Sequence, residues 1–584
     1  MSQKFEDILN LALETPDTVR EQTDTLNIGF DKEMRTWELI VKYHGSLDEL
    51  RTLNITVEYL IAGYAILTVP ENLVERMAQV EQIEYVEKPK RYYYQAVRPA
   101  QESCIPQVTL QEPYLSGENV LIAILDSGIE YRLPVFQKAD GSTRIRFLWD
   151  QSLQREFTEE EINQALQSSD SREQYDLLPS RDVTGHGTAV AGIAAGSVVA
   201  GAGGIGGYSG VAPEADLLVV KLGTPNALGF PRTTEIMRGV VYALQRANEL
   251  QMPLVINLSF GNCYGSHDGS SLLERFLDNA AEIGRTVICV GSGNEGSSGG
   301  HMAGNVAENT SVEVAVARYE PSLNIQLWKN YNDVYRIYLR SPGGQTEEIS
   351  PAVRSGIGDR QGGKYVLRME QTDILVYWGA PAPYSVAQEV YLEMIPAGQP
   401  YVNSGVWTIF IEPIKVVTGQ YYLYLPSSAV RNEQTQFYRP TPQVTLTIPS
   451  TAAKVLTIGA YDSVYDTYAD FSGRGYADEN RTIGVVTAGL TKPDIVAPGV
   501  GVLAPDVYGS YMPLNGTSFA TPIVSGSAAL LMEWGIVRGN DPFLYGEKMK
   551  AYLRAGARPL RGEQELPNDR VGFGALCVAE SLPG

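Results

Sequence analysis

The stretch NVLIAILDSGI (residues 119–129) is the most informative about the fold, because it combines the pattern of a buried strand with an acidic residue at its end. Its unbroken apolar run is typical of a parallel strand that is covered on both faces. Asp126 follows at the carboxyl end of that strand, where the working groups of parallel α/β sheets gather. The stretch therefore predicts an α/β core with chemistry beside Asp126.

The surrounding sequence alternates between apolar strands bounded by Gly and helices. This alternation is typical of a parallel sheet with flanking helices. It runs from about residue 105 to 305 and returns at VLTIGAYD (455–462). The further expected strands are 215–223, 253–261 and 285–294, and the expected helices are 188–197, 232–250, 271–284 and 517–535.

Two other units interrupt or precede this α/β pattern. Residues 306–450 hold short alternating strands separated by turn residues, which predict an all-β, jelly-roll-like sandwich of about eight or nine strands. Residues 1–95 read as a small α+β unit with the order strand, helix, strands, helix, strand. The α/β domain is thus expected in two parts, 96–305 and 451–584.

Composition excludes several classes of protein. The chain has 584 residues with 46 Lys and Arg against 68 Asp and Glu, a formal net charge of -22. An acidic chain is a poor nucleic-acid binder, so we interpret the charge as a solubility feature. Apolar residues make up 44%, enough for a large core. The four Cys lie far apart, which suggests neither a disulfide framework nor a zinc site.

No targeting or membrane segment is expected. The N-terminus is acidic where a signal peptide is basic, and no window was found with the roughly 18 apolar residues of a spanning helix. We expect a soluble monomer in the cytoplasm or another internal compartment, with no membrane partner.

Three segments offer the groups of a nucleophilic site. Beside Asp126, the segment 182–196 places His186 between two Gly at a helix start, and 514–526 places Ser518 at the opening of another helix. A Ser hydroxyl needs a base to take its proton, and a carboxylate orients that base. The segment VGSGNEG (290–296) adds Asn294, whose amide could stabilise an oxyanion.

These four segments resemble the subtilisin-like serine peptidases. ILDSGI, GHGTAVAG, GSGNEG and NGTSFATPIVSG match the family's motifs in order and context, as do KLG (221–223), NLSFG (257–261) and DIVAPG (494–499). The resemblance implies an Asp126, His186 and Ser518 triad with Asn294 in the oxyanion hole, without cofactor or metal. Ile523 departs from the family's frequent His, beyond the nucleophile.

The resemblance also implies a substrate channel and a propeptide. An extended protein or peptide substrate is expected to bind along two channel segments and the primary pocket. Residues 1–95 look like a propeptide, an intramolecular chaperone that stays in the channel as an inhibitor. We predict self-cleavage between Gln95 and Ala96, after an aromatic run. The expected channel and pocket residues are Lys221, Leu222, Gly223, Ser259, Phe260, Gly261, Ser292 and Gly293.

The β insertion narrows the resemblance to the Csp-type subtilases of spore-forming bacteria. This architecture implies cleavage of a cortex-lytic enzyme precursor during germination, and it implies the spore interior or cortex as an alternative location to the cytoplasm. We expect the insertion to brace the α/β core, with glycan or partner binding as the rival role. The alternative for the whole chain is a non-catalytic sensor or scaffold that kept the fold.

Several residues have ordinary explanations. Alone, Asp126 is a strand-end cap, His186 a helix-start residue and Ser518 an N-cap. GAGGIGG (201–207) lacks a strand before it and is interpreted as a surface loop, not a nucleotide site. The acidic run 158–176 predicts a solvated helical insertion, with a calcium site as the weaker reading. The remaining predictions place His44, His267 and His301 in solvent or loops, Cys289 in the core and Cys263 near the cleft.

Overall fold

The computed structural model divides the chain into two compact units, Met1–Tyr94 and Gln95–Gly584. Each unit is described by itself. The structure describes residues 4–20, 29–60, 63–89, 101–201, 207–223, 231–306, 308–350, 364–383, 385–475 and 491–583.

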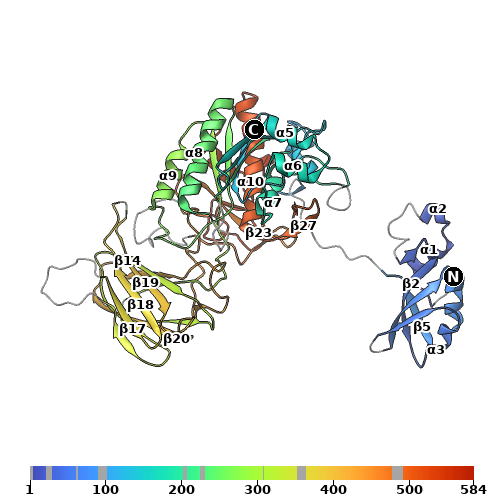
Figure 1. Cartoon of the computed structure of the whole chain (residues 1–584), viewed down its shortest axis with the longest axis horizontal. Helices are drawn as coiled ribbons and strands as arrows, with labels where there is room; N and C mark the ends of the chain where they lie inside the picture. Colours follow the sequence, from blue (N-terminus) through green and yellow to red (C-terminus); the bar gives the residue numbers. More distant parts are fainter. Residues whose placement is uncertain are drawn as a thin grey trace. The chain divides into compact units, whose positions relative to one another are not determined.

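The N-terminal unit is one antiparallel sheet packed against short helices (Figure 1). Its central strand alternates in burial, with Trp37, Leu39 and Val41 facing the core. The order of elements confirms the predicted α+β pattern, although the sequence reading missed the first two helices and residues 71–79 form a 3₁₀ helix. The strands are β1 (Phe30–Asp31), β2 (Thr36–Tyr43), β3 (Thr56–Tyr59), β4 (Tyr64–Pro70) and β5 (Ile83–Glu87), and the helices are α1 (Asp7–Glu14), α2 (Asp17–Arg20), α3 (Asp48–Arg51) and η1 (Glu71–Gln79).

The second unit is built on a nine-stranded sheet in the order β24-β23-β11-β10-β6-β9-β7-β8, with β25 also paired to β23. Its inner strands are parallel, and antiparallel pairs close both ends. The strands are β6 (Leu121–Asp126), β7 (Ile145–Asp150), β8 (Arg155–Thr158), β9 (Asp216–Lys221), β10 (Leu254–Leu258), β11 (Thr286–Gly291), β23 (Leu456–Asp462), β24 (Thr467–Tyr468) and β25 (Ile495–Pro498).

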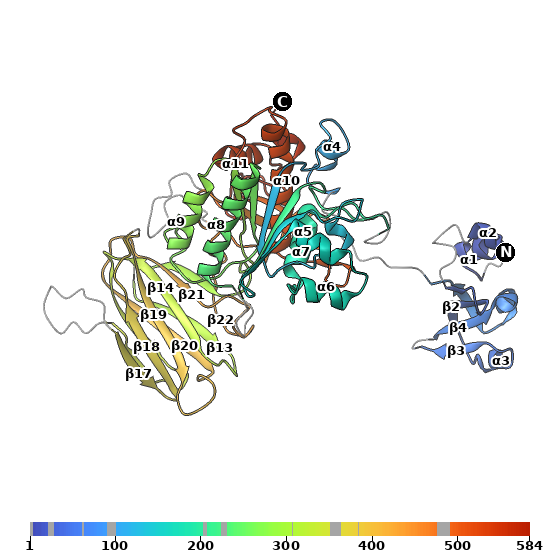
Figure 2. The same ribbon diagram turned by 45° about the horizontal axis from the view of Figure 1, so that its top comes forward.

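Helices cover both faces of this sheet, which explains the unbroken apolar run of β6 (Figures 1 and 2). Ile122 and Ile124 pack into one core with α7 (His186–Ala195) and α10 (Thr517–Met532). Leu121, Ala123 and Leu125 pack into the other with α8 (Thr233–Leu250) and α9 (Leu272–Ala281). The remaining helices are α4 (Pro106–Thr109), η3 (Pro134–Phe136), α5 (Glu159–Leu166), α6 (Ser171–Leu177), η4 (Glu533–Val537), α11 (Gly546–Ala555) and η5 (Ala579–Ser581), and β26 (Val502–Pro505) pairs with β27 (Tyr511–Leu514).

Two expectations about this domain need correction. The segment Thr517–Val537 is long and apolar enough to span a membrane by length and composition, so the expectation of no such window was wrong. Most of that stretch is buried in the core, which is how a soluble protein uses an apolar helix. The sequence reading also missed β7, which forms part of the main sheet.

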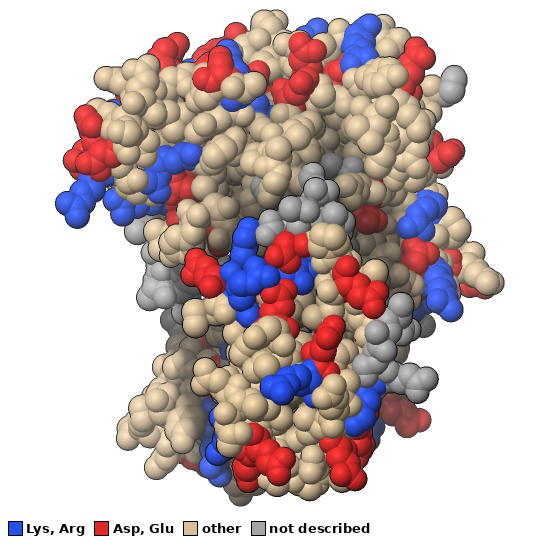
Figure 3. Space-filling view, turned by 90° about the vertical axis from the view of Figure 1, so that its right-hand side faces the viewer, with Lys and Arg blue, Asp and Glu red and all other residues tan. Residues whose placement is uncertain are grey.

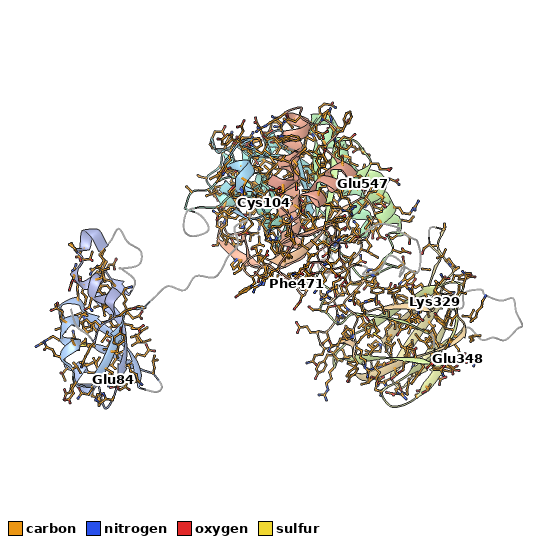
Figure 4. The ribbon with its side chains drawn as sticks, turned by 180° about the vertical axis from the view of Figure 1, so that it is seen from behind. Glu84, Cys104, Lys329, Glu348, Phe471 and Glu547 are labelled. Carbon is orange, nitrogen blue, oxygen red and sulfur yellow. A yellow bond between two sulfur atoms is a disulfide. The ribbon has the colours of Figure 1, made fainter. Side chains whose placement is uncertain are left out.

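The insertion is a sandwich of two antiparallel sheets. A six-stranded sheet has the order β12-β21-β14-β19-β18-β17, and a five-stranded sheet has the order β16-β15-β20-β13-β22. Figure 4 labels Lys329 on β14 of the first sheet and Glu348 on β16 of the second. The strands are β12 (His301–Asn305), β13 (Thr310–Val316), β14 (Leu323–Asn330), β15 (Val334–Arg340), β16 (Thr346–Glu348), β17 (Lys364–Met369), β18 (Thr372–Trp378), β19 (Ala387–Pro396), β20 (Gly405–Lys415), β21 (Gln420–Tyr424) and β22 (Gln436–Phe437).

The sandwich encloses a core that includes Ile337, Val376 and Trp407. Its first strand begins at His301, before the predicted boundary at 306, and its last strand ends at Phe437. An insertion made of β strands is confirmed, whereas its jelly-roll topology stays a prediction. Acidic and basic side chains are interspersed over the part of the whole chain that Figure 3 draws.

The expectation of no disulfide was wrong. Cys104 and Cys577 form a disulfide although 473 positions separate them, and Figure 4 labels Cys104. The fold brings the start of the second unit beside its last residues, a proximity that spacing along the chain does not reveal. Cys263 and Cys289 are free and buried.

Candidate active site

The acid and the imidazole meet where β6 ends and α7 begins. Asp126 is the last residue of β6 and His186 the first of α7. Their close approach depends on Gly187, because a Cβ there would lie 2.2 Å from the carbonyl oxygen of Gly128. The two glycines that flank the motifs thus let the helix start reach the strand end.

The Asp126 carboxylate holds one tautomer of His186. Its Oδ1 lies 2.7 Å from His186 Nδ1 and accepts the Ser127 backbone N–H at 2.7 Å. A carboxylate only accepts, so Nδ1 carries the proton and Nε2 is left as the base. Partial burial lowers the pKa of His186, but the charge and hydrogen bond of Asp126 outweigh it and the pKa is raised.

A second acid, Asp182, shapes the loop before His186, and the sequence reading missed it. It is buried and accepts the Gly185 N–H at 2.9 Å and both the N–H and hydroxyl of Thr188, at 2.8 and 2.7 Å. The Ser127 hydroxyl also donates to it at 2.8 Å. Its position four residues before His186, just ahead of a turn, was the available signal.

Ser518 lies in the first turn of α10. Gly516 precedes this turn with a φ of +147°, which an L side chain rarely adopts. The Ser518 hydroxyl donates to the Ser259 carbonyl at 2.9 Å. The ring of the next residue, Phe519, lies 5.6 Å from the His186 ring, which brings the helix start beside the base. Attack on a substrate requires the hydroxyl to rotate towards Nε2.

A series of hydrogen-bonded polar side chains supports the start of α10. Pro522 has no N–H, so it cannot bond the Ser518 carbonyl four residues earlier. The Ser259 hydroxyl donates to that carbonyl instead, at 3.0 Å. Ser259 in turn accepts from Asn257, which accepts from Ser525, both at 2.8 Å. Side chains of β10 and its extension thereby fix the backbone of the nucleophile.

The Asn294 amide is oriented for an oxyanion. The Thr517 backbone N–H donates to its Oδ1 at 3.0 Å, and the Thr517 hydroxyl is 3.2 Å away. A backbone N–H can only donate, so the bonded atom must be the oxygen and the amide Nδ2 is free to donate elsewhere. The N–H of Ser518, in the first helical turn, has no acceptor within its helix and can join it.

These groups line one cavity of about 430 Å³. Of the predicted channel residues, two lie outside it. Lys221 points to Asp150, with its Nζ 3.2 Å from that carboxylate, and Ser292 is buried behind the wall against Ser472. The predicted residues that do line the cavity are Asp126, His186, Leu222, Gly223, Ser259, Phe260, Gly261, Gly293, Asn294 and Ser518.

The insertion contributes to the same cavity, which the sequence reading missed. Ser427, Ser428 and Ala429 follow β21 and line it together with Glu295 and Thr447. Thr447 fills the space between Gly261 and Gly293, because a Cβ at either glycine would lie within 2.4 Å of its side chain. Only Glu295 had a signal, since it adjoins Asn294 in the GNEG motif.

The other predicted residues have varied settings. His44 is exposed and His267 lies in a loop, both as expected, although His267 is buried there. His301 is buried on β12, so for this residue the expectation was wrong. Cys263 lies behind the cavity wall and accepts the Ser427 hydroxyl at 3.4 Å, and burial raises the pKa of its thiol to about 12. Gln95, Ala96 and most of the glycine run 201–207 lie outside the described residues. Across the described ranges, no group of three or more His, Cys, Asp or Glu could hold a metal.

Two protein families match the chain. The Csp protease B prodomain matches residues 3–90, and the subtilase family matches residues 117–359 and 425–574. The gap between the two subtilase segments falls within the β insertion.

Relatives and a solved structure are similar over different shares of the chain. Serine protease AprX of Bacillus subtilis is 33% identical over 24% of this chain and 32% of its own length. Minor extracellular protease Vpr of B. subtilis is 22% identical over 91% of this chain and 61% of its own length. These matches therefore cover from a third to three fifths of the relatives. The structure of the Clostridium perfringens CspB protease is 32% identical, with a TM-score of 0.74, and the match covers 83% of this chain and 96% of that one.

Proposed function

This chain belongs to the subtilase family, as a Csp-type subtilisin-like peptidase with an N-terminal prodomain, and from this premise we propose that it is an active, self-processing serine endopeptidase. The observation that carries the proposal is the contact between Asp126 and His186 Nδ1, in a cavity that also holds Ser518 and Asn294. The three groups of a hydrolytic triad thus reach one cleft from three segments.

Each group has a defined role in the proposed reaction. His186 Nε2 takes the proton of Ser518 as the hydroxyl oxygen bonds to the scissile carbonyl carbon. Asp126 stabilises the imidazolium that results. The imidazolium returns the proton to the leaving amine, and a water repeats the sequence to release the acyl group. Asn294 Nδ2 and the Ser518 N–H stabilise the oxyanion, where one donor contributes about 10²–10³ in rate.

The first substrate of this site is proposed to be the chain itself. The prodomain match ends at residue 90, close to the predicted bond between Gln95 and Ala96. We propose that the prodomain remains in the channel as an inhibitor after cleavage. A further proposal, which rests on the Csp-type assignment alone, is that the enzyme acts in the cytoplasm or the spore and processes a cortex-lytic enzyme precursor in germination.

A fluorophosphonate probe tests the catalytic proposal. It should label the self-processed wild type at Ser518, and S518A should abolish the label and leave one uncut chain. N-terminal sequencing of the wild-type protein should find a start at Ala96, and a start beyond about residue 105 would contradict the predicted bond. Labelling that S518A does not remove, or a folded wild type that is neither labelled nor cut, would favour a non-catalytic sensor or scaffold.

A further inference from the structure

The carboxylate of Glu295 stands in the cleft wall and is held by the insertion. Glu295 is only 8% exposed, yet it lines the substrate cavity. Ser428 donates its backbone N–H to both carboxylate oxygens, at 3.0 and 3.3 Å. Its hydroxyl donates to the same oxygen as the shorter of these bonds, Oε1, also at 3.0 Å. Oε1 is therefore well supplied with donors, and Oε2 has spare acceptor capacity.

A buried arginine fixes the segment that carries Ser428. Arg431 is 6% exposed and donates to the carbonyls of Pro426 at 2.9 Å and Ser298 at 2.7 Å. It also interacts electrostatically with Glu295 and with the buried Glu320. The segment is thus tied to the loop that follows Asn294, so Ser428 holds a set position. The same guanidinium offsets part of the charge of Glu295.

Thr447 lines the cavity beside two glycines of the channel. Its side chain fills the space between Gly261 and Gly293, and its hydroxyl donates to the Ser292 carbonyl at 3.4 Å. Because Glu295 lines the same cavity, a substrate side chain that enters it can meet both residues.

We propose that Ser428, contributed by the insertion, is a specificity-determining residue of the primary pocket. It occupies one side of the Glu295 carboxylate and leaves Oε2 for a neutral hydrogen-bond donor, a carboxamide, on the substrate residue before the scissile bond. An acidic side chain is repelled by the Glu295 carboxylate, and the hydrogen bonds that Ser428 donates already take up part of that carboxylate's capacity to hold a cation. This inference rests on the proposed peptidase function and agrees with the carboxamide of Gln95 at the predicted self-cleavage bond.

A peptide series that differs only at the residue before the scissile bond tests the proposal. We expect kcat/KM of the full-length wild type to be highest for Gln, with Glu lower by about 100-fold or more. S428A removes one hydrogen bond from Oε1, so the ratio of Lys to Gln should rise about five- to tenfold. E295Q removes the repelling charge and should raise the ratio of Glu to Gln at least about tenfold.

S385A is the matched control, because its hydroxyl also donates to a carboxylate, that of Asp268 at 2.8 Å, but Ser385 is not among the residues that line the cavity. It should leave the ratios within about twofold. Fluorophosphonate titration of each variant separates failure of this inference from failure of the peptidase proposal. Variants that label normally but keep the wild-type ratios would overturn the role of Ser428, as would a wild type that prefers Lys, Glu or Phe to Gln. A folded wild type that neither labels nor cuts its own prodomain would overturn both.

Discussion

His186 lies in the cleft, and His301 lies where the insertion begins. These two histidines have opposite electrostatic surroundings. Burial acts on both imidazoles in the same direction and lowers the pKa. At His186 the Asp126 carboxylate, 2.7 Å away, outweighs burial and raises the pKa. At His301, 3% exposed, the partner is the Thr441 carbonyl at 3.0 Å, and burial lowers the pKa to about 3. An adjacent charge, more than the depth of burial, therefore determines which histidine can take up a proton.

The second setting also joins two parts of the molecule. His267 precedes α9 in the α/β domain, whereas His301 and Tyr424 lie on β12 and β21 of the insertion. The Tyr424 ring stacks with both imidazoles, at centroid distances of 3.9 Å for His267 and 4.5 Å for His301. Burial lowers the pKa of His267 as well. The contact between the insertion and the α/β domain therefore contains neutral imidazoles, whereas catalysis in the cleft requires an imidazole that takes up a proton. We call this contact, made by His267, His301 and Tyr424, the joint.

Asp126→Asn removes the charge that distinguishes the surroundings of His186 from those of His301. The amide cannot serve as the anionic acceptor that holds the Nδ1–H tautomer, so kcat should fall about 10⁴-fold. The melting temperature should change little in comparison, and N-terminal sequencing should show slow or absent self-cleavage. A kcat within about tenfold of wild type would mean that the carboxylate does not set the state of His186.

Acid should act on the two settings in sequence. His186 must be neutral to act as a base, so activity falls as pH drops through a pKa raised above 6.5. His301 keeps its proton off in the folded state down to a pKa of about 3, whereas in the unfolded chain it takes a proton below about 6.5. Its stabilising contribution is therefore complete above 6.5 and is lost as pH falls from there towards 3. Activity should be lost reversibly before the melting temperature begins to drop.

His301→Phe tests the second of these two effects, the loss of stability in acid. It removes one titrating group from the joint, so the melting temperature should depend less on pH between about 6.5 and 4, with the remaining slope due in part to His267. The variant loses the bond to Thr441 and should be somewhat less stable at about pH 8. An unchanged slope would assign the acid sensitivity to carboxylates elsewhere. The pH at which activity is half-maximal should stay with His186 and not move.

The contrast also shows what a sequence can and cannot reveal. Asp126, His186, Ser518 and Asn294 each stand in an extended local motif, so their meeting was predictable. The Glu295 contact spans 133 positions to Ser428, and the disulfide spans 473. Neither leaves a local pattern, because the insertion and the chain ends are brought there by the whole fold.

The burial of His267 and His301 escaped prediction for a related reason. Both have polar and glycine neighbours that are typical of loops. His267 does lie in a loop but packs against Tyr424 and the Leu446 carbonyl, and His301 lies directly opposite Tyr424 on the neighbouring strand. Strand β7 escaped prediction because its sequence IRFLWD mixes charged and apolar residues, as suits a strand near the edge of the sheet. Local signals thus predicted which side chains meet in the cavity and missed the contact between the insertion and the α/β domain.

Tyr424→Phe gives the smallest expected effect and separates stacking from burial at the joint. It keeps the ring that both imidazoles contact and removes the hydroxyl, which donates to the Val444 carbonyl at 3.1 Å. Loss of that bond should lower the free energy of unfolding by about 1 kcal/mol. Because the imidazoles stay buried, the loss should be the same at about pH 8 and about pH 5. A loss that grows in acid would show that Tyr424 helps to keep the imidazoles neutral, and the cause assigned to their lowered pKa would have to include the stack as well as burial.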